Sequence, residues 1–165
     1  MDSTPLRLAY TRLLAAAETV AAAGGGIPEP GEWNADQLLA HLVSVDAGIL
    51  AVACSVAAGG QATFDNRLSL DPWNLALISE RAGDQAQLRQ RIRVQGEALC
   101  SLAEQLSEDE LGQSIPTRLL SGNTLMVDQP VSLGDLIAGL ADGHLPQHTQ
   151  QLLALLQQDA LLGVT

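Results

Sequence analysis

The sequence predicts an all-α protein, a four-helix bundle, and three observations support this fold class. Apolar residues recur at intervals of three and four in four long segments. The hydrophobic fraction is 47% but only 2% of residues are aromatic, so we expect a core of many small aliphatic contacts, as in packed helices. No segment has a strand pattern that would build a sheet. The length of 165 residues fits a single domain, 1–165.

The first helix is predicted from its start and end signals. Thr4 followed by Pro5 gives an N-cap and a proline at the first helical position. The triple glycine 24–26 ends the helix, and the proline-containing linker 27–33 is expected to be extended.

The second helix begins at a predicted capping box formed by Asn34 and Gln37. The glycines 59–60 end it, and 61–70 is expected to be a polar connection. The apolar seam alternates steps of four and three, as in a left-handed bundle. Its members are Leu38, Leu42, Val45, Ile49, Val52 and Val56.

A third, long helix is predicted over 73–106. Asp71 and Pro72 repeat the pattern of a cap followed by proline. Gly83 and Gly96 interrupt the apolar stripe, so a kink is expected near one of them.

Residues 107–156 predict a short helix, then a hairpin or irregular segment, and then the last helix. A capping box opens a short helix over 107–112, and 113–130 reads as a short hairpin or irregular excursion around the turn 121–123. Ser132 with Asp135 caps the last helix, over 133–156.

The charge excludes some partners. All eight basic residues are arginine, against nineteen acidic residues, which gives a net charge of −11. Such a chain has no basic stripe to neutralise phosphates, so neither nucleic acid nor an anionic membrane surface is expected as a partner. The N-terminus shows no secretory signal, and the apolar stretch 38–58 contains Asp46, which is costly in a bilayer. We therefore expect a cytoplasmic protein.

Two of the three histidines occupy the apolar stripe of the last helix. His144 and His148 are four residues apart, which places them about 40° apart on one helix face. A buried imidazole needs partners for its ring nitrogens, so the pair either bonds to buried neighbours or binds a metal ion. The third histidine, His41, lies beside the seam of the second helix. Cys54 and Cys100 are expected to be free buried thiols.

Three segments resemble the DinB-like superfamily, which includes the N-terminal domain of mycothiol-dependent maleylpyruvate isomerase and related thiol-dependent transferases. They are GEWNADQLLAHL at 31–42, DPWNLALISERAG at 71–83 and HLPQH at 144–148. The resemblance implies an up-up-down-down bundle with long crossovers, and a metal ion held by one side chain of the second helix and two of the last.

Carried over residue by residue, the implied metal ligands are His41, His144 and His148. The isomerase-like branch usually has glutamate where this chain has His144, so the site here is neutral before metal binds. Pro146 stands between the two ligands of the last helix and is expected to kink it. The resemblance also implies a homodimer.

The proposed chemistry follows from an open metal site. Three imidazoles leave a position open on a divalent ion, and zinc or nickel suits such ligands best. The resemblance implies that a low-molecular-weight thiol, with mycothiol as the candidate, binds there as thiolate and attacks a small electrophile, in S-transfer or thiol-assisted isomerisation. The alternatives are a hydrolase that uses metal-bound hydroxide and a non-catalytic metal-binding or dimerisation module.

Several other residues are candidates for roles around the site. Asn74 and Arg81 match the isomerase-like run and are candidates for substrate binding. Arg81 would hold a carboxylate or, alternatively, form a surface ion pair with Glu80 or Asp84. Trp33 either lines the mouth of a pocket or wedges a helix end. Two acidic residues, Asp46 and Asp142, have two possible roles. Each either orients a metal ligand through a hydrogen bond or is a surface or helix-cap residue.

Overall fold

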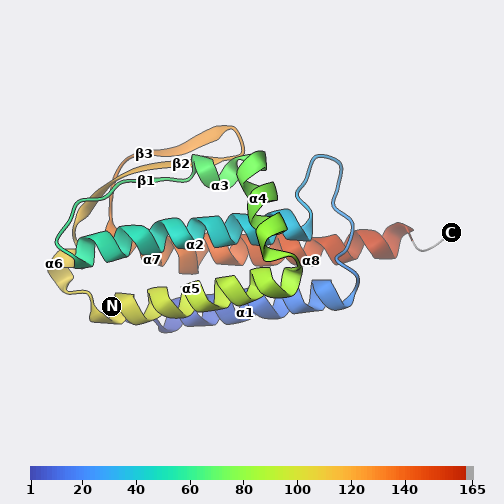
Figure 1. Cartoon of the computed structure of the whole chain (residues 1–165), viewed down its shortest axis with the longest axis horizontal. Helices are drawn as coiled ribbons and strands as arrows, with labels where there is room; N and C mark the ends of the chain where they lie inside the picture. The colour runs from blue at the N-terminus through green and yellow to red at the C-terminus, as the bar shows by residue number, and fades with distance from the viewer. Residues whose placement is uncertain (163–165) are drawn as a thin grey trace.

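The computed structural model describes residues 1–162 and shows a mostly helical protein with a small three-stranded sheet (Figure 1). The long helical segments are α1 (Thr4–Ala22), α2 (Ala35–Ala57), α5 (Gln85–Gln105) and a last segment composed of α7 (Leu133–Gly139), the π-helical turn η1 (Leu140–His144) and α8 (Leu145–Leu162). The short helices are α3 (Arg67–Leu70), α4 (Pro72–Ala82) and α6 (Glu108–Leu111). The strands are β1 (Phe64–Asp65), β2 (Ser114–Ser121) and β3 (Thr124–Ser132).

The helix α1 packs between α5 and α8, and their directions follow from residues near their ends. The ammonium group of Met1 donates to the carbonyl of Ala103 at the end of α5, so α1 and α5 are antiparallel. Just beyond the end of α1, the amide of Ile27 donates to the carbonyl of Leu155 in α8, so α1 and α8 are parallel.

The helix α2 packs against α5 and α8 and runs antiparallel to α8. The carbonyl of Gly60, just after α2, accepts from Gln113, whose own carbonyl accepts from the amide of Leu133 at the start of α7. The directions of α1, α2, α5 and α8 are therefore up, down, down and up (Figure 1). The up-up-down-down order that the resemblance implied is wrong for this chain. The order depends on contacts between distant residues, on which helix periodicity carries no information.

The predicted helix starts are confirmed to within one residue. Asn34 and Gln37 form the full capping box of α2, and Asp71 accepts from the amide of Asn74 at the start of α4. In α1 the N-cap is Ser3 and not Thr4, one residue earlier than predicted.

The predicted long helix over 73–106 is two helices, α4 and α5. Gly83 ends α4 with a φ of 86°, in the left-handed region that glycine adopts at little cost. The carboxylate of Asp84 then accepts from the amide of Gln87 and caps α5. The interruption expected near Gly83 or Gly96 is thus a full break at Gly83.

The predicted excursion over 113–130 is an antiparallel hairpin of β2 and β3 that turns at Gly122 and Asn123. The expectation that no sheet forms is wrong, since β1 pairs in parallel with β2. β1 lies in the segment expected to be a polar connection. The sequence did not indicate this strand because two residues are too few to show an alternating pattern. Phe64 of β1 is buried against Gly48 of α2.

The helix α2 is central to the hydrophobic core that the described residues form. It is long and apolar enough to cross a membrane by length and composition, but 61% of its most apolar window is buried inside the fold. This burial is what the core helix of a soluble protein requires, and it explains why α2 is apolar on more than one face.

Replacing Gly26 with alanine is expected to lower the free energy of unfolding by about 2 kcal/mol, and Tm by about 4–8 °C. Gly26 has a φ of +67°, and a Cβ built there would lie 2.7 Å from Cβ and the carbonyl oxygen of Leu155. Gly24→Ala is the matched control, because Gly24 has a φ of +88° but nothing within 4 Å of the added Cβ. Thermal melts that show equal losses for both variants would contradict the close contact between Gly26 and α8.

Candidate metal centre

His41 is placed by the first two turns of α2. The capping box at Asn34 fixes where the helix begins, and the side chains of residues 38–43 are all buried. His41 is 3% exposed, although it lies on the flank of the predicted seam. α2 has buried neighbours on several sides, so this flank also faces the interior.

His144 and His148 are placed by the π-helical turn before Pro146. The amide of Leu145 donates to the carbonyl of Leu140, five residues back, which makes this turn wider than an α-helical one. In a regular helix the ring of Pro146 would clash with the carbonyl of Asp142. The wide turn accommodates the proline, so the expected distortion takes the form of a π-turn and does not separate the two histidines.

The three imidazoles converge at their Nε2 atoms. Nε2 of His144 lies 3.1 Å from Nε2 of His41 and 3.2 Å from Nε2 of His148. One ring nitrogen from each residue lies within 4.8 Å of the other two. The ring planes are inclined to one another by 48°, 59° and 78°, so the rings are not stacked.

Hydrogen bonds on the far side of two rings indicate where their protons lie. Nδ1 of His41 is 2.7 Å from the carbonyl oxygen of Ser69, and Nδ1 of His148 is 2.6 Å from Oε1 of Gln151. Both partner oxygens can only accept, so both Nδ1 atoms donate. In a neutral imidazole, Nε2 then carries a lone pair. Both lone pairs face the common point of the cluster.

The donor set fits a metal ion. Nitrogen ligands at 2.0–2.1 Å from a tetrahedral ion are about 3.3 Å apart, close to the two observed separations. Two lone pairs that converge in a buried place repel each other unless a proton or a cation lies between them. The residues His41, His144 and His148 therefore suit a divalent ion, and all three would contribute neutral nitrogen.

Burial keeps these rings neutral. It lowers the pKa of His41, and it lowers the pKa of His148 to about 4. The pKa of His144 is lowered well below its usual value by burial and by the two neighbouring histidines. The neutral form is the one that binds a metal ion.

His144 differs from the other two histidines. Its Nδ1 is buried and has no hydrogen-bond partner among the described residues. His41 and His148 are each oriented by an oxygen, whereas the orientation of His144 depends on packing and on the cluster itself. Gln151, which orients His148, was missed by the sequence analysis. Its position three residues after His148, on the same helix face, was the available signal.

The other predicted site residues lie at different distances from the cluster. The ring of Trp33 packs against His41, with centroids 5.0 Å apart. The side-chain amide of Asn74 donates to the carbonyl of Leu68 and to the hydroxyl oxygen of Ser44, so it is engaged within the protein. Arg81 is exposed and takes part in none of the ion pairs found among the described residues, so its expected pairing with Glu80 or Asp84 is not formed.

The two acidic residues differ in environment. Asp142 is exposed, as expected for a surface residue. Asp46 is fully buried and accepts from the hydroxyl of Tyr10 at 2.8 Å, so the prediction of a surface or cap position is wrong for it. Cys100 is a free buried thiol as predicted, whereas Cys54 is free but exposed.

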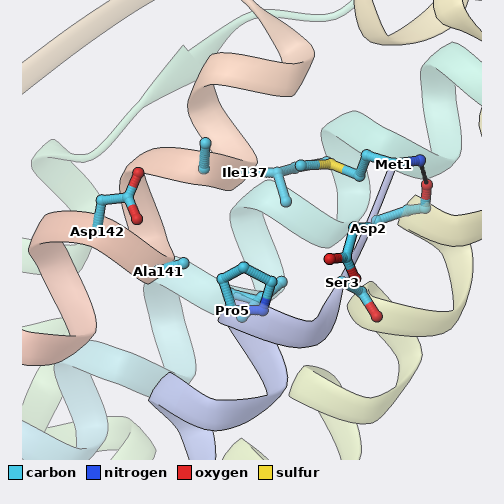
Figure 2. Close-up of a pocket in the computed structure, with 10 residues that line it drawn as sticks. Met1, Asp2, Ser3, Pro5, Ile137, Ala141 and Asp142 are labelled. Atoms are coloured by element: carbon cyan, nitrogen blue, oxygen red, sulfur yellow. Dashed lines mark hydrogen bonds between the residues drawn. The ribbon is translucent and has the colours of Figure 1, made fainter.

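No histidine lines either of two cavities found among the described residues. One of about 80 Å³ lies between the start of α1 and the helical turns of α7 and η1, and its lining residues include Pro5, Ile137 and Ala141 (Figure 2). The other, of about 330 Å³, is an open groove beside α2, β1 and α3, and its lining includes Ser44 and Ser69. The groove thus reaches the residues that support His41.

A family model described as the DinB superfamily matches residues 6–152, a range that includes all three histidines. No curated protein matches the chain, and no solved structure does.

Proposed function

Since the chain belongs to the DinB superfamily, we propose that His41, His144 and His148 bind one divalent metal ion and that this site is the functional centre of the protein. The observation that carries the proposal is the convergence of the three Nε2 atoms, two of which are lone-pair acceptors because their Nδ1 atoms donate elsewhere. The four long helical segments support a four-helix bundle of DinB type as the scaffold.

The donor set favours zinc or nickel. Neutral imidazole nitrogen suits both ions, and three protein ligands leave a position open, as in catalytic sites. A structural zinc site would normally have four protein ligands. The open coordination position of the metal ion is the reason to propose a catalytic site and not a structural one.

We propose that the cosubstrate is a low-molecular-weight thiol, with mycothiol as the candidate. When bound, a divalent ion supplies positive charge that lowers the pKa of a thiol in its open position. The protein does not supply this thiol itself: Cys54 is exposed near the far end of α2, and Cys100 is buried in α5. Trp33, packed on His41, is the residue we assign to the wall of the substrate site.

The protein loaded with Zn²⁺ or Ni²⁺ is expected to consume an electrophilic aryl chloride only when a thiol is present. The measurements are the rates of aryl chloride loss, chloride release and S-aryl product formation, with and without the metal and with and without the thiol. His148→Ala, treated with the same metal, is the control for reaction in free solution. Turnover without thiol would favour the hydrolase, and metal binding without turnover would favour a non-catalytic module.

A further inference from the structure

Ser69 contacts α2 at two points. Its carbonyl accepts from Nδ1 of His41 at 2.7 Å, and its hydroxyl donates to the hydroxyl oxygen of Ser44 at 2.9 Å. His41 and Ser44 are three residues apart on α2 and share a face. Ser69 itself is buried, with 5% of its surface exposed. One residue of α3 is therefore fixed to the same helix that carries the first histidine.

The segment that presents this carbonyl is not stable alone. α3 has four residues, and a helix of one turn has no stability of its own in water. Side-chain hydrogen bonds hold it in place: the side-chain amide of Asn74 donates to the carbonyl of Leu68 at 2.9 Å and to the hydroxyl oxygen of Ser44 at 3.3 Å. The Ser44 hydroxyl thus accepts from two donors and joins α2, α3 and α4 beside His41.

We propose that Ser44, Ser69 and Asn74 are positioning residues of the metal centre. They hold the Ser69 carbonyl against Nδ1 of His41, which fixes the proton on Nδ1 and leaves the lone pair of Nε2 facing the other two histidines. This inference rests on the proposed metal site. It also changes the role of Asn74, whose amide is used inside the protein and not for a substrate.

The variant Ser44→Ala removes the acceptor for both donors while it leaves every histidine in place. We expect its affinity for Zn²⁺, measured by competition with a chromophoric chelator, to fall roughly 10-fold, as for other residues that orient a ligand. The second readout uses the metal-free protein. The ¹⁵N shifts of the His41 ring are expected to change from the pure Nδ1–H tautomer to a mixture of tautomers.

Two variants of α2 serve as controls. Ser44→Thr keeps the hydroxyl, and its extra methyl group has room because Ser44 lines the open groove, so we expect affinity and tautomer to be restored. Ser55→Ala makes the same substitution on the same helix at a hydroxyl that donates to the carbonyl of Gln61, and it is expected to change neither readout. Asn74→Ala is a second test of the network in case Ser44→Ala does not fold.

Wild-type affinity and an unchanged His41 tautomer in folded Ser44→Ala or Asn74→Ala would overturn the inference. If the wild-type protein bound no metal, the proposed function would fail. A change of tautomer in metal-free Ser44→Ala would still support the positioning role in that case. The two failures are therefore distinguishable.

Discussion

Replacing His148 with alanine is expected to lower the affinity of the protein for Zn²⁺ by at least about 100-fold. Zinc binding to a four-ligand protein site amounts to about 10–16 kcal/mol, so the loss of one ligand costs about 3 kcal/mol or more. His148 contributes a neutral nitrogen that Gln151 holds in place. The measurement is a competition titration against a chromophoric chelator at pH 7.5.

The control for His148→Ala is Gln147→Ala, the neighbouring exposed position on the same helix. It should bind Zn²⁺ as the wild-type protein does. Thermal melts of the metal-free proteins show whether each variant is folded. Equal affinity in folded His148→Ala and wild type would remove this residue from the metal site.

Replacing Asp46 with asparagine is expected to stabilise the protein above pH 7 by about 4 kcal/mol and to have little effect near pH 4. Burial raises the pKa of Asp46 to about 7, although the hydrogen bond from Tyr10 opposes this shift. The buried Oδ2 has no partner among the described residues, so the charged form is poorly solvated. Asparagine has nearly the same shape and carries no charge.

The sign follows from proton binding. Between about pH 4 and 7 the folded protein keeps a proton on Asp46 that the unfolded chain has lost, so stability falls as the pH rises, by about 1.4 kcal/mol for each pH unit. Above pH 7 both states are charged and this contribution is constant. Denaturant unfolding of wild type and Asp46→Asn between pH 5 and 8.5 measures the difference. Asp142→Asn, at an exposed position, is the control, and parallel curves for Asp46→Asn and wild type would show that Asp46 is not a strained buried acid.

Local signals in the sequence predicted local structure well. The capping box of Asn34 and Gln37 and the cap at Asp71 depend on residues within one turn, so sequence alone was sufficient for them. The directions of the helices and the pairing of β1 with β2 depend on contacts between distant residues. The same limit explains the error on Asp46, since its burial is produced by neighbouring helices such as the one that carries Tyr10.

The candidate site was predicted as a set of residues but not as an arrangement. The spacing of His144 and His148 and the resemblance to a family together selected three histidines that the structure brings together. The supporting atoms were not predicted. The acceptor for His41 is a backbone carbonyl, which any residue possesses, so nothing in the identity of Ser69 indicates it. The π-turn before Pro146 was likewise expected only as a kink, because a proline specifies that a helix is disturbed but not how it adapts.

The most direct measurement is anomalous diffraction from crystals of the protein grown with Zn²⁺, with data collected on both sides of the zinc absorption edge. The proposed site predicts one anomalous peak among Nε2 of His41, His144 and His148, bonded to all three. The absence of a peak there, or a peak bound by other residues, would contradict it.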